Sequence, residues 1–350
     1  MSDESSIMTN VSDATTTMEE TSVTGVTVNI NVTSLSPGTK IYFRLAVVVI
    51  GVIGTAANGL ILYALVASKQ HKSHVLIVNQ NALDLFGCIF LVISYAVKLS
   101  DIHLSGWIGY WLCMLIVNDN IVWCGIIGSV INLAIITVER YLKVAHYAWS
   151  KAKLHNSMIY SAMAFAWIYS VVYNSVFSFS ASFMVNGVCY PAIIENESLK
   201  NFHLLYNFVS FYVIILLIFI FCYWRILLVV RRQAKIMSNH AAARSNTSQT
   251  HKQIQTNVIK TMILVCGFYA VMWLPIQITQ FIWALSENLI ISMNSHYSIY
   301  YASMFLAFMY TCTNPFIYAT KFDPVKQVLL RMMPCKKTTN QASIQLNMVV

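Results

Sequence analysis

Hydrophobic positions along the chain gather into seven long stretches separated by short polar segments. A bilayer core about 30 Å thick needs roughly 20 apolar residues in helical form, and each stretch is long enough. Five stretches contain no Asp, Glu, Lys or Arg, and the other two contain one acid each, Asp84 and Asp119. The pattern predicts seven membrane spans, over residues 45–68, 73–97, 110–138, 156–184, 201–224, 261–286 and 288–320.

Helices are the structure that such spans favour, because lipid offers no hydrogen-bond partner to a backbone amide. A composition of 57% hydrophobic and 10% charged residues agrees with lipid as the solvent. After the last span, Asp323 and Pro324 suit a helix start. Apolar residues then recur at helical spacing opposite Lys326 and Arg331, at Phe322, Val325, Val328, Leu329 and Met332. We predict an all-α membrane protein, a seven-transmembrane helix bundle with a short amphipathic cytoplasmic helix after the seventh span.

Basic residues fall almost entirely on alternate connections. Of the 22 Lys and Arg residues, 18 lie on one side of the membrane and four on the other, namely Lys40, Arg44, Lys98 and Lys200. The positive-inside rule then predicts an extracellular amino terminus and a cytoplasmic carboxyl terminus. Residues 1–40 are interpreted as a disordered extracellular tail, 41–320 as the membrane domain and 321–350 as the cytoplasmic helix and tail. The net charge of +9 therefore indicates contact with inner-leaflet lipids and a cytoplasmic partner, and not with nucleic acid.

Sequons for N-glycosylation occur on the predicted outer side at three positions, Asn10, Asn31 and Asn196. A fourth sequon, at Asn246, falls on the inner side, where we expect it to stay unmodified. Because the modification belongs to surfaces exposed in the secretory pathway, the placement supports the predicted orientation.

Cysteines divide by position into three groups. Five lie within spans, where a thiol packs like a small apolar side chain: Cys88, Cys124, Cys222, Cys266 and Cys312. Cys113 and Cys189 alone face the oxidising side, which predicts a disulfide between them. Cys335 follows the amphipathic stretch at the inner surface, where palmitoylation and an unmodified thiol are both compatible with the sequence.

Polar residues inside the spans mark candidate functional positions. Asp84 lies mid-span, where a charge costs several kcal/mol unless it is protonated, hydrated or paired. It is either a neutral acid bonded to neighbouring helices or part of a cation or water site, with Asn58, Ser129 and Asn314 as candidate partners. At the inner end of the third span stands Glu139-Arg140-Tyr141, whose Arg can exchange partners when neighbours move. Pro275 and Pro315 interrupt the sixth and seventh spans, as hinges or as static kinks.

These residues together resemble the class A, rhodopsin-like G-protein-coupled receptors, over about residues 40 to 335. The matching motifs occur in the family's order and at the expected depths. They are Gly54, Asn58-Gly59, Asn79, Ala82-Leu83-Asp84, Cys113, Ser129, Leu133, Glu139-Arg140-Tyr141, Trp167, Cys189, Tyr223, Trp273-Leu274-Pro275 and Asn314-Pro315-Phe316-Ile317-Tyr318.

The resemblance implies a receptor and not an enzyme, located in the plasma membrane. It implies that Asp84, Ser129 and Asn314 form an interior polar site that sodium occupies, below a hinge at Trp273 and Pro275. On activation the switch residues would open a cytoplasmic cleft for a heterotrimeric G protein, with arrestin and a receptor kinase as further partners. The switch residues are Glu139, Arg140, Tyr141, Tyr223, Asn314, Pro315 and Tyr318.

The chain also departs from the family's pattern at several places. Residues 202–230 contain no proline, which argues against the bulge usual in the fifth span. Gln255 stands where the family commonly has an acid that holds Arg140, which argues against an inactive-state ion pair between these positions. The spacing from Cys113 to Arg140 is a couple of residues longer than usual, which puts the disulfide in question. Met272 replaces the Cys that often precedes the Trp.

Ligand chemistry is narrowed by three observations. Residues 288–320 contain no lysine, so retinal cannot bind as a Schiff base and the chain is not an opsin. Val122 replaces the Asp of aminergic receptors, and Asp119 lies one turn nearer the outside, facing either a ligand cation or water. The candidate ligand-binding residues are Asp119, Gln277, Gln280, Trp283 and Tyr301, which favour a short peptide. Glu195 and Glu197, together with the acidic amino-terminal tail, favour a basic one.

Three other functions compete with a signalling receptor. A seven-helix transporter or channel would show an internal repeat or paired broken spans, and neither is apparent. A membrane enzyme would show a cluster of His, Asp or Glu with metal-ligand spacing, and no span has one. A non-signalling binding protein agrees less well with the intact Arg140 and Tyr318 motifs.

Overall fold

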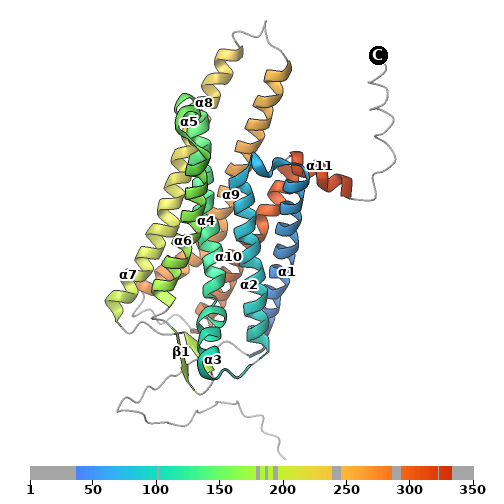
Figure 1. Cartoon of the computed structure of the whole chain (residues 1–350). Coiled ribbons are helices and arrows are strands. Elements are labelled where there is room, and N and C mark those ends of the chain that lie inside the picture. The colour runs from blue at the N-terminus through green and yellow to red at the C-terminus, as the bar shows by residue number, and fades with distance from the viewer. Residues whose placement is uncertain are drawn as a thin grey trace, which may run out of the picture. The chain divides into compact units, whose positions relative to one another are not determined.

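A computed structural model gives the fold, and it describes residues 37–100, 102–178, 182–185, 188–191, 196–238, 246–285, 293–321 and 323–332. Within these residues the long helices lie side by side as a bundle (Figure 1). Four of the spans are single helices: α1 (Pro37–Ala67), α2 (Val75–Leu99), α6 (Asn156–Ser178) and α10 (Met293–Lys321). The sixth span lies in α9 (Asn246–Leu285), and the other two are composite. The predicted seven-helix bundle is confirmed.

Connections between the long helices contain short elements. A 3-10 turn, η1 (Gln70–Lys72), joins α1 to α2, and α5 (Tyr147–Lys153) joins the third span to α6. The amphipathic helix predicted after the seventh span is α11 (Asp323–Met332), with Val325 buried and Lys326 and Arg331 exposed. Both α5 and α11 lie toward one end of the bundle, called the α11 end below, and β1 and α3 (Gly106–Leu112) lie at the other, called the hairpin end (Figure 1).

Five of the described helical spans are long and apolar enough to cross a membrane by length and composition. The remaining two, α6 and α10, contain more Tyr, Ser and Asn but have no charged residue over 156–178 and 293–320. Large apolar side chains face outward along the bundle, for example Val49 on α1 and Leu217 and Ile220 on α8 (Ile214–Ser238). Such extended apolar faces are what a lipid solvent covers.

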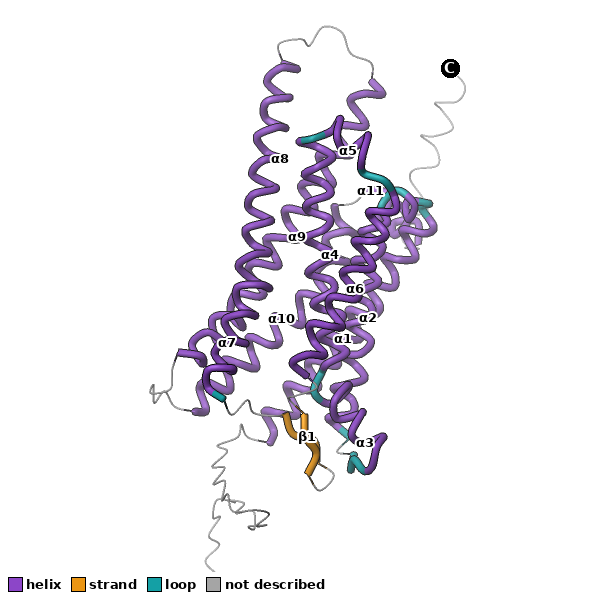
Figure 2. The backbone as a smooth tube through the Cα atoms, turned by 60° about the vertical axis from the view of Figure 1, so that its left-hand side comes forward, coloured by secondary structure: helices purple, strands orange, loops and turns teal. Residues whose placement is uncertain are grey.

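The bundle interior is filled by aromatic and polar side chains. α1 packs on α2 and α10, α4 (Asn120–Ala145) packs on α2, α6 and α8, and α9 packs on α10. The largest fully buried side chains include Trp273, Tyr269, Tyr310, Tyr318 and Phe308, which all come from α9 and α10. Helices α8 and α9 continue beyond the apolar stretches at the α11 end, where the yellow α8 and the orange α9 rise past their neighbours in Figure 1. Figure 2 shows the same two extensions from another side.

The third span is broken, although the sequence predicted one span over 110–138. It consists of α3, a π-helical turn η2 (Cys113–Val117) and α4. Asp119 sits between η2 and α4 in the left-handed conformation, with φ 59°. The side-chain amide of Asn120 donates to the carbonyl of Met114 across the break. The wide π turn and the following two residues absorb the extra length between Cys113 and Arg140.

The fifth span contains the bulge that the missing proline argued against. It consists of α7 (Glu197–Asn207), the π-helical turn η3 (Phe208–Val213) and α8. Two tyrosines bond the region to α9, since the Tyr269 hydroxyl donates to the carbonyl of Phe211 and the Tyr212 hydroxyl donates to the carbonyl of Ala270 at 2.9 Å. The expectation was wrong because a partner helix satisfies the carbonyl group that a π turn leaves unpaired.

The fourth span is shorter than the predicted range of 156–184. Helix α6 ends at Ser178, and the segment Ser182–Val185 forms strand β1, which pairs antiparallel with β2 (Val188–Pro191). Ser182 lies opposite Pro191 and Met184 lies opposite Cys189. The apolar run continued past the helix because hairpin residues such as Phe183 and Val185 are themselves apolar.

Candidate functional site

Asp84 is the centre of a buried polar cluster between α2, α4 and α10. Its carboxylate is fully buried, and each oxygen accepts a short hydrogen bond from another helix. Ser129 Oγ donates to Oδ1 at 2.6 Å, and Asn314 Nδ2 donates to Oδ2 at 2.7 Å. The structure thus places together the three residues that the resemblance assigned to an interior site.

Gln80 is a fourth member of this cluster that the sequence reasoning missed. Its Nε2 lies 2.5 Å from Ser129 Oγ and 3.4 Å from Asp84 Oδ2. Its Oε1 accepts a hydrogen bond from Asn132 Nδ2 at 2.9 Å. The signal was available, because Gln80 precedes Asp84 by one helical turn and Asn132 follows Ser129 by three residues, so each pair shares a helix face.

The cluster continues to α6 through side-chain amides. Asn79 Nδ2 donates to Asn132 Oδ1 at 2.8 Å, and Trp167 Nε1 donates to Asn79 Oδ1 at 3.0 Å. Asn58 instead joins α1 to α10, since its Nδ2 donates to the carbonyls of Gly54 at 2.9 Å and Thr311 at 3.2 Å. Four helices are therefore linked by hydrogen bonds from Trp167 to Asn314.

The donor set around Asp84 does not fit the sodium ion that the resemblance implies. Hard cations take oxygen ligands, so the side chains around the carboxylate would have to present oxygen atoms. Asn314 and Gln80 instead present their amide nitrogens to Asp84, and Ser129 Oγ already accepts from Gln80. In this arrangement N–H and O–H groups satisfy the carboxylate.

Below this cluster, toward the hairpin end, lies an aromatic core around Trp273. The Trp273 ring contacts Phe211 at 4.9 Å between centroids and Tyr269 at 6.1 Å. Within the described residues its indole nitrogen has no hydrogen-bond partner, so packing alone fixes the ring. Pro275 lies inside α9 two residues later, where the missing N–H weakens the helix ladder. The Trp273 ring therefore lies beside a point of α9 that lacks a backbone hydrogen bond, which is an arrangement that permits hinge motion.

At the α11 end, Arg140 is held only loosely in the part of the chain that the structure describes. Arg140 Nε lies 3.1 Å from Glu139 Oε2, an ion pair between adjacent residues that lacks hydrogen-bond geometry. Lys143, one turn later, pairs with the other oxygen of the same carboxylate. The side chain of Gln255 lies outside the described residues, and no ion pair joins Arg140 to the described part of α9.

Three further switch residues are tyrosines of α4, α8 and α10. Tyr223 of α8 lies 3.3 Å from the hydroxyl of Thr137, which is one turn before Tyr141 on α4. Tyr141 contacts His146 at 3.0 Å through its hydroxyl. Tyr318 is fully buried in α10, three residues after the helix-interior Pro315. The switch residues therefore come from α4, α8 and α10, and Asn314 is the one that lies in the Asp84 cluster.

His74, just before α2, faces the same charged residues. Burial is the main reason that the pKa of its imidazole falls from 6.5 to about 4. The positive charges of Arg140 and Lys143 lower the pKa further, and Glu139 opposes them. His74 is therefore neutral at physiological pH in the fold.

At the hairpin end, Asp119 forms a buried ion pair that the sequence reasoning did not foresee. Asp119 Oδ2 lies 2.5 Å from Lys98 Nζ, and that nitrogen also lies 4.1 Å above the ring of Tyr95. Arg44 Nη1 donates to the backbone carbonyl of Lys98 at 2.5 Å. Asp119 thus has a cation from its own chain as partner.

The other candidate ligand-binding residues are less closely grouped. Gln277 is buried on α9 with no hydrogen-bond partner for its Oε1 among the described residues, and Gln280 lies half-buried one turn later. Tyr301 contacts the ring of Phe43 on α1 at 4.7 Å. The side chain of Trp283 lies outside the described residues.

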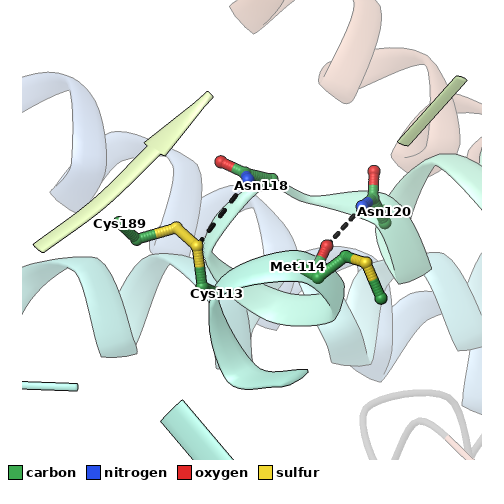
Figure 3. The surroundings of a disulfide bond; sticks show 5 residues. All are labelled: Cys113, Met114, Asn118, Asn120 and Cys189. Carbon is green, nitrogen blue, oxygen red and sulfur yellow. Dashed lines mark hydrogen bonds between the residues drawn. A yellow bond between two sulfur atoms is a disulfide. The ribbon is translucent and has the colours of Figure 1, made fainter. Parts of the chain in front are cut away.

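The predicted disulfide between Cys113 and Cys189 is confirmed and ties the hairpin to η2, with a Cα–Cα distance of 5.4 Å (Figure 3). Asn118 Nδ2 lies 4.0 Å from the Cys113 sulfur (Figure 3). The five cysteines within the spans are free thiols. Asn196 is exposed and caps α7, while Asn10, Asn31 and Cys335 lie outside the described residues.

Comparisons with known proteins agree on one family. The family described as "7 transmembrane receptor (rhodopsin family)" matches residues 57–318. Similar proteins include G-protein coupled receptor 15 of Mus musculus, 24% identical over 87% of this chain and 82% of that protein, and melatonin receptor type 1A of Mus musculus, 22% identical over 80% and 76%. Rhodopsin of Todarodes pacificus is 24% identical over 67% of this chain, a match that spans 54% of the squid protein.

A crystal structure of squid rhodopsin shows the same fold. It superposes with a TM-score of 0.68 at 19% identity and covers 90% of this chain and 92% of the squid chain. The fold and the family are those of receptors and not of enzymes. Since the family match extends over most of the chain and includes the Asp84 cluster and the Arg140 end, this multi-pass membrane protein belongs to the rhodopsin family of seven-transmembrane receptors.

Proposed function

We propose that the chain is a plasma-membrane receptor that converts binding of an extracellular ligand into activation of a heterotrimeric G protein. The hairpin end would face outward and the α11 end inward, as the positive-inside rule predicts from the distribution of 18 of the 22 basic residues. The observation that carries the proposal is the loose hold on Arg140, which is paired within its own helix and is free to take a new partner. Arrestin and a receptor kinase would use the same inner face.

Activation would be a population shift between two packings of the bundle. An agonist bound at the hairpin end would favour the state in which the ring of Trp273 moves and α9 swings about Pro275. The inner half of α9 would then move away from α4. Arg140 would leave Glu139, and Tyr223 and Tyr318 would turn toward the opened cleft, where the G protein binds.

The ligand that best suits the hairpin end is a short peptide. Lys98 and Asp119 offer a cation and an anion side by side, so a ligand with both basic and carboxylate groups could exchange partners with each. Gln277 and Gln280 add hydrogen-bonding capacity on α9. Retinal is not proposed, although rhodopsin of Todarodes pacificus and pinopsin of Columba livia are among the similar proteins, because residues 288–320 contain no lysine.

A screen of peptide and amine libraries with readouts for several G-protein classes tests this function. For an active ligand, Arg140→Ala should abolish G-protein activation while ligand affinity stays within about threefold, because Arg140 lies far from the ligand end. Lys153→Ala, which removes an exposed cation from α5 at the same end, is the matched control and should signal normally. Full signalling by Arg140→Ala would contradict the proposed role, and ligand-gated ion flux without G-protein activation would indicate a channel.

A further inference from the structure

Five buried or half-buried side chains form a directed series of hydrogen bonds from α6 to Asp84. The series runs from Trp167 to Asn79, then to Asn132, Gln80 and finally Ser129 and Asp84. Gln80, Asn132 and Asp84 are fully buried, and Asn79 is 5% exposed. In such surroundings a side-chain amide keeps its orientation, because a reversed amide would place donors against donors.

Groups at the two ends of the series have only one hydrogen-bonding role, and they fix its direction. The indole N–H of Trp167 can only donate, so Asn79 must present its oxygen there and its nitrogen to Asn132. Asn132 then donates to the carbonyl of Leu76 at 3.0 Å and to Gln80 Oε1 at 2.9 Å. Gln80 is left with its two N–H groups directed at the oxygens of Ser129 and Asp84.

Reversing Gln80 would be strongly unfavourable. Its Oε1 would then face the carboxylate of Asp84, and its Nε2 would face Asn132 Nδ2. Each contact would join two groups of the same kind in a site without exposed surface. The orientation of Gln80 is therefore determined by Trp167 of another helix, through the two intervening residues Asn79 and Asn132.

We propose that the Gln80 amide takes the place of a cation at Asp84, so that this interior site works without sodium. The Gln80 nitrogen bridges the oxygens of Ser129 and Asp84, which are two of the atoms that a bound cation would use. Together with Ser129 and Asn314 it gives the carboxylate three donors, an arrangement that stabilises a buried anion without a counter-ion. A cation placed between the oxygens of Ser129 and Asp84 would displace Gln80, which would break the bond to Asn132 as well.

Thermal unfolding of the full-length receptor tests this proposal without a ligand. The purified protein in detergent micelles would be heated in sodium chloride or in choline chloride at equal ionic strength. We expect the Tm of the natural protein to be the same in both salts. Gln80→Ala removes the bridging amide and leaves the oxygens of Asp84 and Ser129 open, so sodium should raise its Tm by about 2 °C or more relative to choline.

Two further variants separate a cation site from general salt effects. The double variant Gln80→Ala with Asp84→Asn should lose the sodium-dependent rise, because the carboxylate that would hold the ion is gone. Gln80→Met keeps most of the side-chain volume without the N–H groups, and it should also gain sodium dependence if Gln80→Ala does not fold. The proposal is overturned if the natural protein shows a sodium-specific rise that Asp84→Asn removes, or if neither single variant gains one.

Discussion

Gly125 lies where the backbones of α4 and α2 approach closely, and replacing it with alanine should both destabilise the bundle and disturb the Asp84 cluster. A Cβ at position 125 would lie 2.8 Å from Gly87 Cα and 2.9 Å from Gly87 N. These are backbone atoms, which cannot rotate away as the end of a side chain can. The contact is roughly 0.7 Å shorter than an ordinary carbon contact of about 3.5 Å, so the helices must separate.

The separation would reach the polar cluster because Gly125 and Gly87 lie about one turn from Ser129 and Asp84. Moving the helices apart by that amount would lengthen the Ser129–Asp84 bond from 2.6 Å to about 3.3 Å, outside the usual range of about 2.5–3.0 Å, and would weaken it. Overpacking costs about 1–3 kcal/mol, and a buried hydrogen bond to a charged group contributes about 1.5–3 kcal/mol. Since the effects overlap, we expect a loss of about 2–4 kcal/mol for Gly125→Ala.

Apparent Tm measurements on the purified receptor in micelles can test this expectation. Gly59→Ala in α1 is the matched control, because a Cβ there meets nothing within 4 Å. It should leave the Tm unchanged or raise it slightly, since alanine favours a helix over glycine by about 1 kcal/mol. Gly125→Ala should lower the Tm by about 5 °C or more. Equal Tm values for the two variants would refute the assigned close contact.

Two further predictions concern the α11 end. Lys143→Ala should lower ligand-independent signalling by about twofold or more in a G-protein assay, because Glu139 loses its second cation and holds Arg140 more firmly; an increase would contradict this competition. Acidification from pH 7 toward pH 5 should lower the apparent Tm, because the pKa of His74 is about 4 in the fold and ordinarily 6.5. The unfolded chain binds a proton first, so stability is present above pH 6.5 and is lost as the pH falls toward 4. His74→Gln should show a smaller loss than the control His103→Gln, and equal losses would exclude His74 as a cause.

The two π-helical turns, η2 and η3, show how the structure accommodates two departures from the family's sequence pattern. The extra residues before Arg140 do not shift the disulfide, because η2 and the left-handed Asp119 accommodate them. The missing proline of the fifth span does not remove the bulge, because Tyr269 bonds to Phe211 from α9. In the first case the local backbone conformation absorbs the change, and in the second a contact with another helix compensates for it.

Asp119 illustrates a prediction whose partner the sequence could not supply. Its position near the outer end of the third span was evident, and a ligand cation or water were the two partners considered. Lys98 lies 21 residues earlier on a neighbouring helix, and nothing in its spacing indicates that both side chains meet. Removing one partner of such a buried ion pair strongly destabilises the fold, because the other charge is left without a partner. The structure of the hairpin end therefore depends on both Lys98 and Asp119.

The sequence by itself determined the helices, their number and the depth of each motif, because a bilayer admits only segments that satisfy their own backbone groups. It also located Asp84, Arg140 and Trp273 by their positions along the spans. It paired Cys113 with Cys189 because these two cysteines alone face the oxidising side. The tertiary structure decided which polar side chains meet: Gln80 with both Asp84 and Asn132, and Lys98 with Asp119. Such partners depend on how each helix is rotated and where it is interrupted, and contacts between helices set both.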